Sequence, residues 1–181
     1  MRWIYVGLGS MTCYLVVRAI LTSLFLSGQS HLPKVKSPNY DLMLRALLDR
    51  NVPEVDVAQV ARHQMTYQWL DARSRDEYEV SHLAQARWVG YDDFNEERIA
   101  HLDKNQKVIV YCSVGYRSEK ITQQLSKLGF KEVYNLYGGI FEWINQGYKV
   151  VDMSGRTTSR VHVYNKVWGL WVNRGQKVYF K

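Results

Sequence analysis

One cysteine in the sequence stands at the start of a loop that also contains an arginine. Cys112 follows the apolar residues 108–111, and Gly115 and Arg117 lie in the loop after it. A thiolate is a nucleophile, and a guanidinium can hold an oxyanion through two parallel hydrogen bonds. The alternative is a small buried hydrophobe that closes a strand, since free cysteine is often buried. The residues thus offer either a nucleophilic sulfur beside an anion receptor or a packed strand end.

The loop itself favours the nucleophile. Residues 112–117 form a tight turn before a helix that we expect to start near Ser118. The N–H groups of such a loop point inwards and bind anions, and the helix N-terminus adds positive potential. Gly115 permits the backbone angles that this curvature often demands. The inward N–H groups and the helix N-terminus both stabilise a thiolate relative to a thiol.

The elements around the loop predict an α/β fold. Short apolar strands alternate with helices, which indicates β–α units around a mainly parallel sheet. In such sheets ligands bind at the carboxyl ends of the strands, where Cys112 stands. Asn39 or Asp41 is expected to cap the first helix. Strands are expected near the start of 52–63 and within 67–72, 86–90, 107–111 and 132–136, and helices within 39–51, 74–83, 91–102, 118–130 and 138–147.

Three ordered motifs resemble those of single-domain rhodaneses, the thiosulfate-type sulfurtransferases. Residues 112–118, "CSVGYRS", resemble the loop C-x-x-G-x-R-S, and residues 69–89 and 129–150 resemble the segments before and after it. Ser81 and Gln85 replace two usual glycines, in a turn without chemistry of its own. The resemblance implies a rhodanese-like open, mainly parallel sheet with helices on both faces, plus an N-terminal hydrophobic segment and a C-terminal extension.

The resemblance also implies a reaction and a set of site residues. The Cys112 thiolate attacks the outer sulfur of thiosulfate or a similar donor, sulfite leaves, and the persulfide passes to cyanide or a thiol. Arg117 is expected to hold the sulfonate of the donor, and no metal or organic cofactor is implied. The other expected substrate-binding residues supply loop amides: Ser113, Val114, Gly115, Tyr116 and Ser118. Four further motif residues are expected to tie the strand end to the next helix: Asp71, Arg73, Glu77 and His82.

Two other functions stay open at this point. Phosphatases that share the rhodanese fold have one more residue between cysteine and arginine, whereas four residues intervene here, which disfavours phosphatase or arsenate reductase chemistry. A non-catalytic or redox-sensing binding module is the second alternative, although inactive versions of the domain typically replace the cysteine. Because Cys13 lies outside the domain, an intramolecular disulfide mechanism is not expected.

The composition limits the kinds of partner that we expect this protein to bind. The net charge of +7 is uneven, because residues 152–181 hold six Lys or Arg against one acidic residue, or +5. The remainder is nearly neutral, so we expect no nucleic-acid partner. Two distant cysteines and five scattered histidines predict no metal site. The expected partners are a small sulfur donor and a thiol or cyanide acceptor.

The two ends of the chain differ from its middle. Residues 3–28 carry one charge, Arg18, and are typical of a membrane anchor or a signal peptide. A buried helix of the domain is the third interpretation. We therefore expect a membrane-anchored or exported protein (periplasmic or extracytoplasmic), with its orientation open. The extension predicts either strands packed on the domain or a basic aromatic patch for an anionic membrane. The expected organisation is a targeting segment (1–30), a linker and helix (31–51), a rhodanese domain (52–150) and an extension (151–181).

Overall fold

The computed structural model describes residues 34–179. Cys13 and the apolar stretch 3–28 lie outside these residues, and so do the predictions made for them. Among the residues described, none of the helices combines the length and the apolar character that crossing a bilayer requires.

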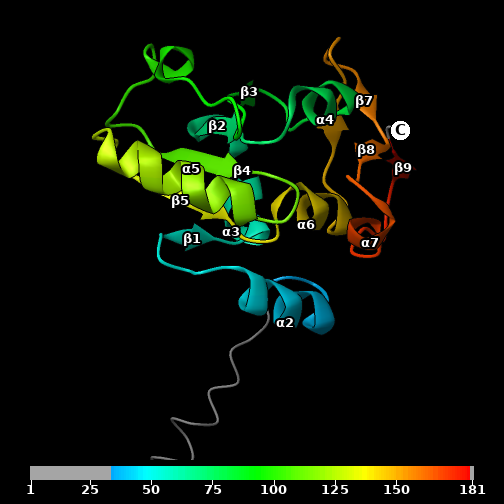
Figure 1. Cartoon of the computed structure of the whole chain (residues 1–181). Coiled ribbons are helices and arrows are strands. Elements are labelled where there is room, and N and C mark those ends of the chain that lie inside the picture. The colour runs from blue at the N-terminus through cyan, green and yellow to red at the C-terminus, as the bar shows by residue number, and fades with distance from the viewer. Residues whose placement is uncertain (1–33, 180–181) are drawn as a thin grey trace, which may run out of the picture. The chain divides into compact units, whose positions relative to one another are not determined.

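A five-stranded sheet forms the centre of the fold, and all its pairings are parallel. The predicted α/β architecture with a parallel sheet is confirmed. Parallel neighbours need a crossover between them, and helices supply most of these crossovers (Figure 1). In spatial order the strands are β1 (Glu54–Val55), β5 (Val133–Leu136), β4 (Val108–Tyr111), β2 (Gln68–Asp71) and β3 (Arg87–Trp88).

Strand side chains alternate between two separate cores. Trp69 and Ile109 face one core, which also contains residues of the first and last helices, whereas Leu70 and Val110 face the other. This follows from the two-residue period of a strand. Cys112 continues the alternation and belongs to the second core, together with the buried face of helix α5 (Tyr116–Lys127). Figure 1 shows α5 lying along the sheet.

Four helices lie where the sequence predicts them, with shifted ends: α2 (Pro38–Leu47), α4 (Arg75–Val80), α5 (Tyr116–Lys127) and α6 (Gly139–Asn145). The short helix α3 (Val57–Ala61) follows the strand expected at the start of 52–63, and α7 (Lys166–Gly169) was not predicted. Two 3₁₀ turns, η1 (Gln64–Thr66) and η2 (Glu96–Ile99), also occur, and the second replaces the helix expected within 91–102.

Two predicted helix starts were wrong. Ser37 caps α2 instead of Asn39 or Asp41, because its hydroxyl accepts from the Tyr40 N–H and Pro38 occupies the first helical position. Asp41 instead pairs with Arg45 one turn later. Helix α5 begins at Tyr116, two residues before Ser118, since Gly115 turns the chain with a φ of 118°.

The C-terminal extension packs on the domain. Two antiparallel strands, β6 (Val150–Val151) and β7 (Thr157–Thr158), lead into a parallel pair, β8 (Arg160–His162) and β9 (Gln176–Val178). Trp171 stacks on Tyr40 with ring centroids 5.5 Å apart. Both atoms of the Asn145 amide bond the same segment: Nδ2 donates to the Trp171 carbonyl and Oδ1 accepts from the Asn173 N–H. Strands and buried aromatic contacts agree with the first reading of the extension.

Candidate active site

Cys112 lies at the carboxyl end of the central strand β4, with its side chain almost fully buried. The Gly115 N–H donates to the Cys112 sulfur over 3.1 Å. A side chain at Gly115 would be strained, because its φ of 118° is rarely adopted by other residues. The twelve-residue helix α5 starts at the next position, so its positive N-terminus faces the sulfur end of the loop. The loop therefore offers this sulfur one direct N–H donor.

Helix α6 fixes the backbone of the same loop. The N–H groups of Ile140 and Phe141 donate to the carbonyls of Cys112 and Ser113 at 2.9 and 3.2 Å. A Cβ at Gly139 would lie 2.4 Å from the Cys112 carbonyl oxygen, so only glycine permits this approach. Because these carbonyls bond α6, their negative ends are engaged away from the sulfur.

A buried asparagine that the sequence analysis did not single out also holds the loop. Asn135, on β5, donates from Nδ2 to the Gly115 carbonyl at 3.1 Å, and its Oδ1 lies 2.7 Å from the Ser118 hydroxyl. An asparagine inside the strand predicted within 132–136 was the signal for it. Ser118 is fully buried, so it braces the loop from behind.

Arg117 and Ser113 share a buried carboxylate. Arg117 donates to the two Glu77 oxygens over 2.6 and 2.8 Å, and the Ser113 hydroxyl donates to Glu77 Oε1 over 2.8 Å. Burial alone raises the pKa of Glu77, but the hydrogen bonds and charge of Arg117, together with Arg73 and Ser113, outweigh it and lower the pKa to about 2. Glu77 is thus ionised at neutral pH and compensates the charge of Arg117.

Glu77 thereby joins parts of the chain that are distant in sequence. It also accepts from the Ser74 N–H within the capping box of α4. The expected role, tying the strand end to the next helix, covers only this capping contact. Glu77 and Arg117 are forty positions apart, so sequence spacing could not predict the second contact.

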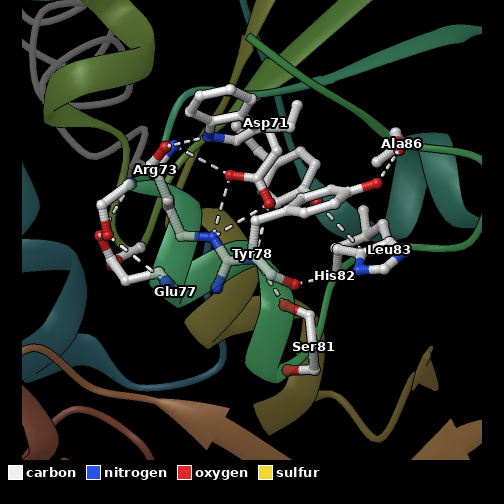
Figure 2. Close-up of polar contacts among 12 residues, drawn as sticks. Asp71, Arg73, Glu77, Tyr78, Ser81, His82, Leu83 and Ala86 are labelled. Atoms are coloured by element: carbon white, nitrogen blue, oxygen red, sulfur yellow. Dashed lines mark hydrogen bonds and ion pairs between the residues drawn. The ribbon is translucent and has the colours of Figure 1, made fainter. Parts of the chain in front are cut away.

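The other three motif residues lie around the end of β2 and helix α4 (Figure 2). Arg73 and Asp71 form a fully buried ion pair with an N–O distance of 2.6 Å, and Arg73 also donates to the Ser81 carbonyl. His82 places Nδ1 3.0 Å from the Tyr78 carbonyl and stacks on the Tyr78 ring. None of these three lines the pocket described next.

A pocket of about 400 Å³ opens above Cys112. Its floor is the loop, including Ser113, Val114 and Arg117, and its walls are mostly aromatic. Within residues 34–179, no three histidine, cysteine or carboxylate side chains cluster as a metal ion requires. The wall residues are Leu47 from α2, Tyr91 and Asp92 after β3, Tyr116 at the start of α5, and Tyr164 and Trp168 from the extension.

The site thus consists of a cysteine at a strand end in a loop that ends with an arginine. The sequence pattern described as a rhodanese-like domain matches residues 56–146. The chain belongs to the rhodanese-like family. The thiosulfate sulfurtransferase GlpE of Coxiella burnetii is 40% identical over 73 residues, which are 40% of this chain and 67% of that protein.

Other members of the family carry different names. The tRNA uridine(34) hydroxylase of Sodalis glossinidius is 40% identical over 81 residues, or 41% of this chain, but the matched part spans only 23% of that protein. A solved rhodanese-related protein from Thermoplasma volcanium superposes with a TM-score of 0.50 at 29% identity, covering 55% of this chain and 97% of its own. The rhodanese-like fold is therefore shared, while the names of its carriers differ.

Proposed function

We propose that the chain is a sulfurtransferase that carries sulfane sulfur as a persulfide on Cys112, with thiosulfate or a similar donor. The observation that carries the proposal is the hydrogen bond from the Gly115 N–H to the Cys112 sulfur at the floor of the pocket. An N–H donor stabilises negative charge on sulfur, both in the attacking thiolate and in the persulfide that follows. The likeness to a thiosulfate sulfurtransferase supports this chemistry.

The proposed reaction has two displacements. The Cys112 thiolate attacks the outer sulfur of thiosulfate, the sulfur–sulfur bond of the donor breaks, and sulfite leaves with the electron pair. The acceptor then attacks the outer persulfide sulfur and releases the Cys112 thiolate. Arg117 lines the pocket and is proposed to meet the sulfonate of the donor, while Glu77 keeps its guanidinium in a fixed direction.

The mass of the purified protein after exposure to thiosulfate tests this proposal. The native chain is expected to gain one sulfur, which cyanide releases as thiocyanate, and Cys112→Ser is expected to gain none. A gain from inorganic polysulfide but not from thiosulfate would keep the persulfide and change the donor. No gain from either would overturn the proposal and leave a binding or redox-sensing module.

The hydroxylase name of other relatives is not transferred to this chain, because the shared segment is about a quarter of their length. Phosphatase and arsenate reductase chemistry stay disfavoured by the four residues between Cys112 and Arg117.

Membrane attachment or export is a separate proposal, supported by the apolar residues 3–28 alone. Fractionation of cells that express the intact chain tests it. Recovery of the full-length protein in the soluble cytoplasmic fraction would end this proposal without affecting the chemistry at Cys112.

A further inference from the structure

Three pocket residues come from outside the segment that the family shares. The family match covers residues 56–146, whereas Leu47 precedes it and Tyr164 and Trp168 follow it. The floor of the pocket therefore belongs to the shared segment, while part of its wall lies outside that segment. Residues that line a pocket but lie outside the shared segment are candidates for substrate selection.

The extension contributes two rings to the wall, and Trp168 is the better anchored of them. Trp168 packs against the core that contains Tyr40 and Trp143, and its backbone N–H donates to the Asn165 side chain at 3.0 Å. The stacked Trp171 and the Asn145 amide anchor the same segment to the domain. Tyr164 has a positive φ of 63°, follows the buried Val163 and is 61% exposed. Both rings line the pocket that contains Cys112.

The pocket offers a ligand mainly aromatic surface. Two of its lining residues are charged, Arg117 and Asp92. Arg117 lies in the loop at the floor, where Glu77 holds its guanidinium, whereas Asp92 is exposed and solvent screens its charge. The floor therefore suits the anionic donor, and the wall offers an acceptor mainly apolar burial.

We propose that this wall binds the organic body of the sulfur acceptor, a small thiol with an aromatic or aliphatic body, and selects it over thiols that lack such a body. The inference rests on the proposed persulfide chemistry and names its acceptor class. The acceptor thiolate attacks the outer sulfur of the Cys112 persulfide and forms a new sulfur–sulfur bond. The bond to the Cys112 sulfur breaks, the cysteine leaves as a thiolate, and the acceptor leaves as an organic persulfide. Electrons balance without a further reductant or oxidant.

The first experiment measures how the wall affects the alkylation of Cys112, without any sulfur transfer. The rate of Cys112 alkylation by N-benzyliodoacetamide is divided by the rate with iodoacetamide, and the ratio is normalised to that of free N-acetylcysteine. We expect a normalised ratio of about ten for the native chain, since burial of one aromatic ring contributes on the order of one decade in affinity. Trp168→Ala and Tyr164→Asn should each lower it about threefold or more.

Leu170→Ala is the matched control. Leu170 follows α7 and is 72% exposed, but it does not line the pocket. Asparagine at position 164 tolerates the positive φ of that position, so Tyr164→Asn removes the ring with little backbone strain even if Trp168→Ala unfolds the segment. A native ratio near one, or an equal loss in Leu170→Ala, overturns the inference.

The second experiment measures transfer itself. Cys112 is loaded with inorganic polysulfide, and its discharge by 2-phenylethanethiol is compared with discharge by 2-mercaptoethanol and by cyanide. The thiol with the phenyl ring is expected to react about tenfold faster than 2-mercaptoethanol after correction for thiol acidity, and Trp168→Ala should narrow this difference in rate. Loading that fails while the alkylation ratio stays high refutes the sulfurtransferase proposal but not the aromatic wall; normal loading with no preference among thiols refutes the wall.

Discussion

Glu77→Gln tests how strongly one buried carboxylate holds the cysteine loop. The glutamine keeps the shape of the side chain and can still bond Ser113, but it removes the negative charge opposite Arg117. That guanidinium is only 19% exposed, so little water replaces the lost partner. Breaking a buried ion pair from one side costs about 3–5 kcal/mol.

The pKa of Glu77 gives an independent magnitude. It falls from an ordinary 4.5 to about 2 in the folded chain. At about 1.4 kcal/mol for each tenfold change in proton affinity, the ionised form contributes about 3 kcal/mol to folding at neutral pH. Because the folded pKa is the lower one, this contribution is present above pH 4.5 and is lost as the pH falls towards 2.

Urea unfolding of the native chain and of Glu77→Gln between pH 7 and pH 3 measures this contribution. We expect the free energy of unfolding of the variant to be about 3 kcal/mol lower at pH 7, and this difference to fall to about half near pH 3. Glu79→Gln, on the same helix but half-exposed in a surface pair with Arg75, should cost less than about 1 kcal/mol. The reasoning would be refuted if Glu77→Gln lost no more free energy of unfolding at pH 7 than Glu79→Gln does. It would also be refuted if the difference between the native chain and Glu77→Gln did not decrease towards pH 3.

Three further predictions concern the supports of the site. Gly139→Ala should abolish persulfide loading and lower the melting temperature more than Gly129→Ala, because both positions have positive φ but only Gly139 has the Cys112 carbonyl in the way. Burial lowers the pKa of His82 below 6.5, so the native chain should lose stability as the pH falls from 6.5 through the folded value, and His82→Asn should flatten that profile in thermal melts. Asn145→Ala should cost about 1–3 kcal/mol in urea unfolding, since two partly buried hydrogen bonds to the extension disappear; an unchanged midpoint would show that the extension is held by its apolar contacts alone.

The sequence predicted the order of the elements and the position of the cysteine, for physical reasons. Alternating apolar strands and amphipathic helices are local patterns, and a cysteine after an apolar strand falls at the carboxyl edge of a parallel sheet. The N-cap of α2 was predicted wrongly because Asn39, Asp41 and Ser37 are all good caps, and only the position of Pro38 decides among them.

Contacts across the chain could not be predicted in the same way. The role of Glu77 at Arg117 depends on how α4 lies beside the loop, and the aromatic wall depends on where the extension returns to the domain. The extension reads as strands with scattered rings, and nothing in that pattern states which ring meets the pocket. Such tertiary contacts need the packed structure.

Helix α6 touches the cysteine loop with its first turn and the extension with its last residue. Ile140 and Phe141 hold the loop carbonyls, and Asn145 grips the chain at Trp171 and Asn173. The shared family segment therefore depends on the extension for the position of helix α6. Cutting the chain after residue 150 would free the far end of the helix whose near end holds the backbone of Cys112, so the cysteine loop of a shortened domain would differ from that of the full chain. Grafting the extension onto another member of the family would, for the same reason, require an asparagine at the end of the corresponding helix.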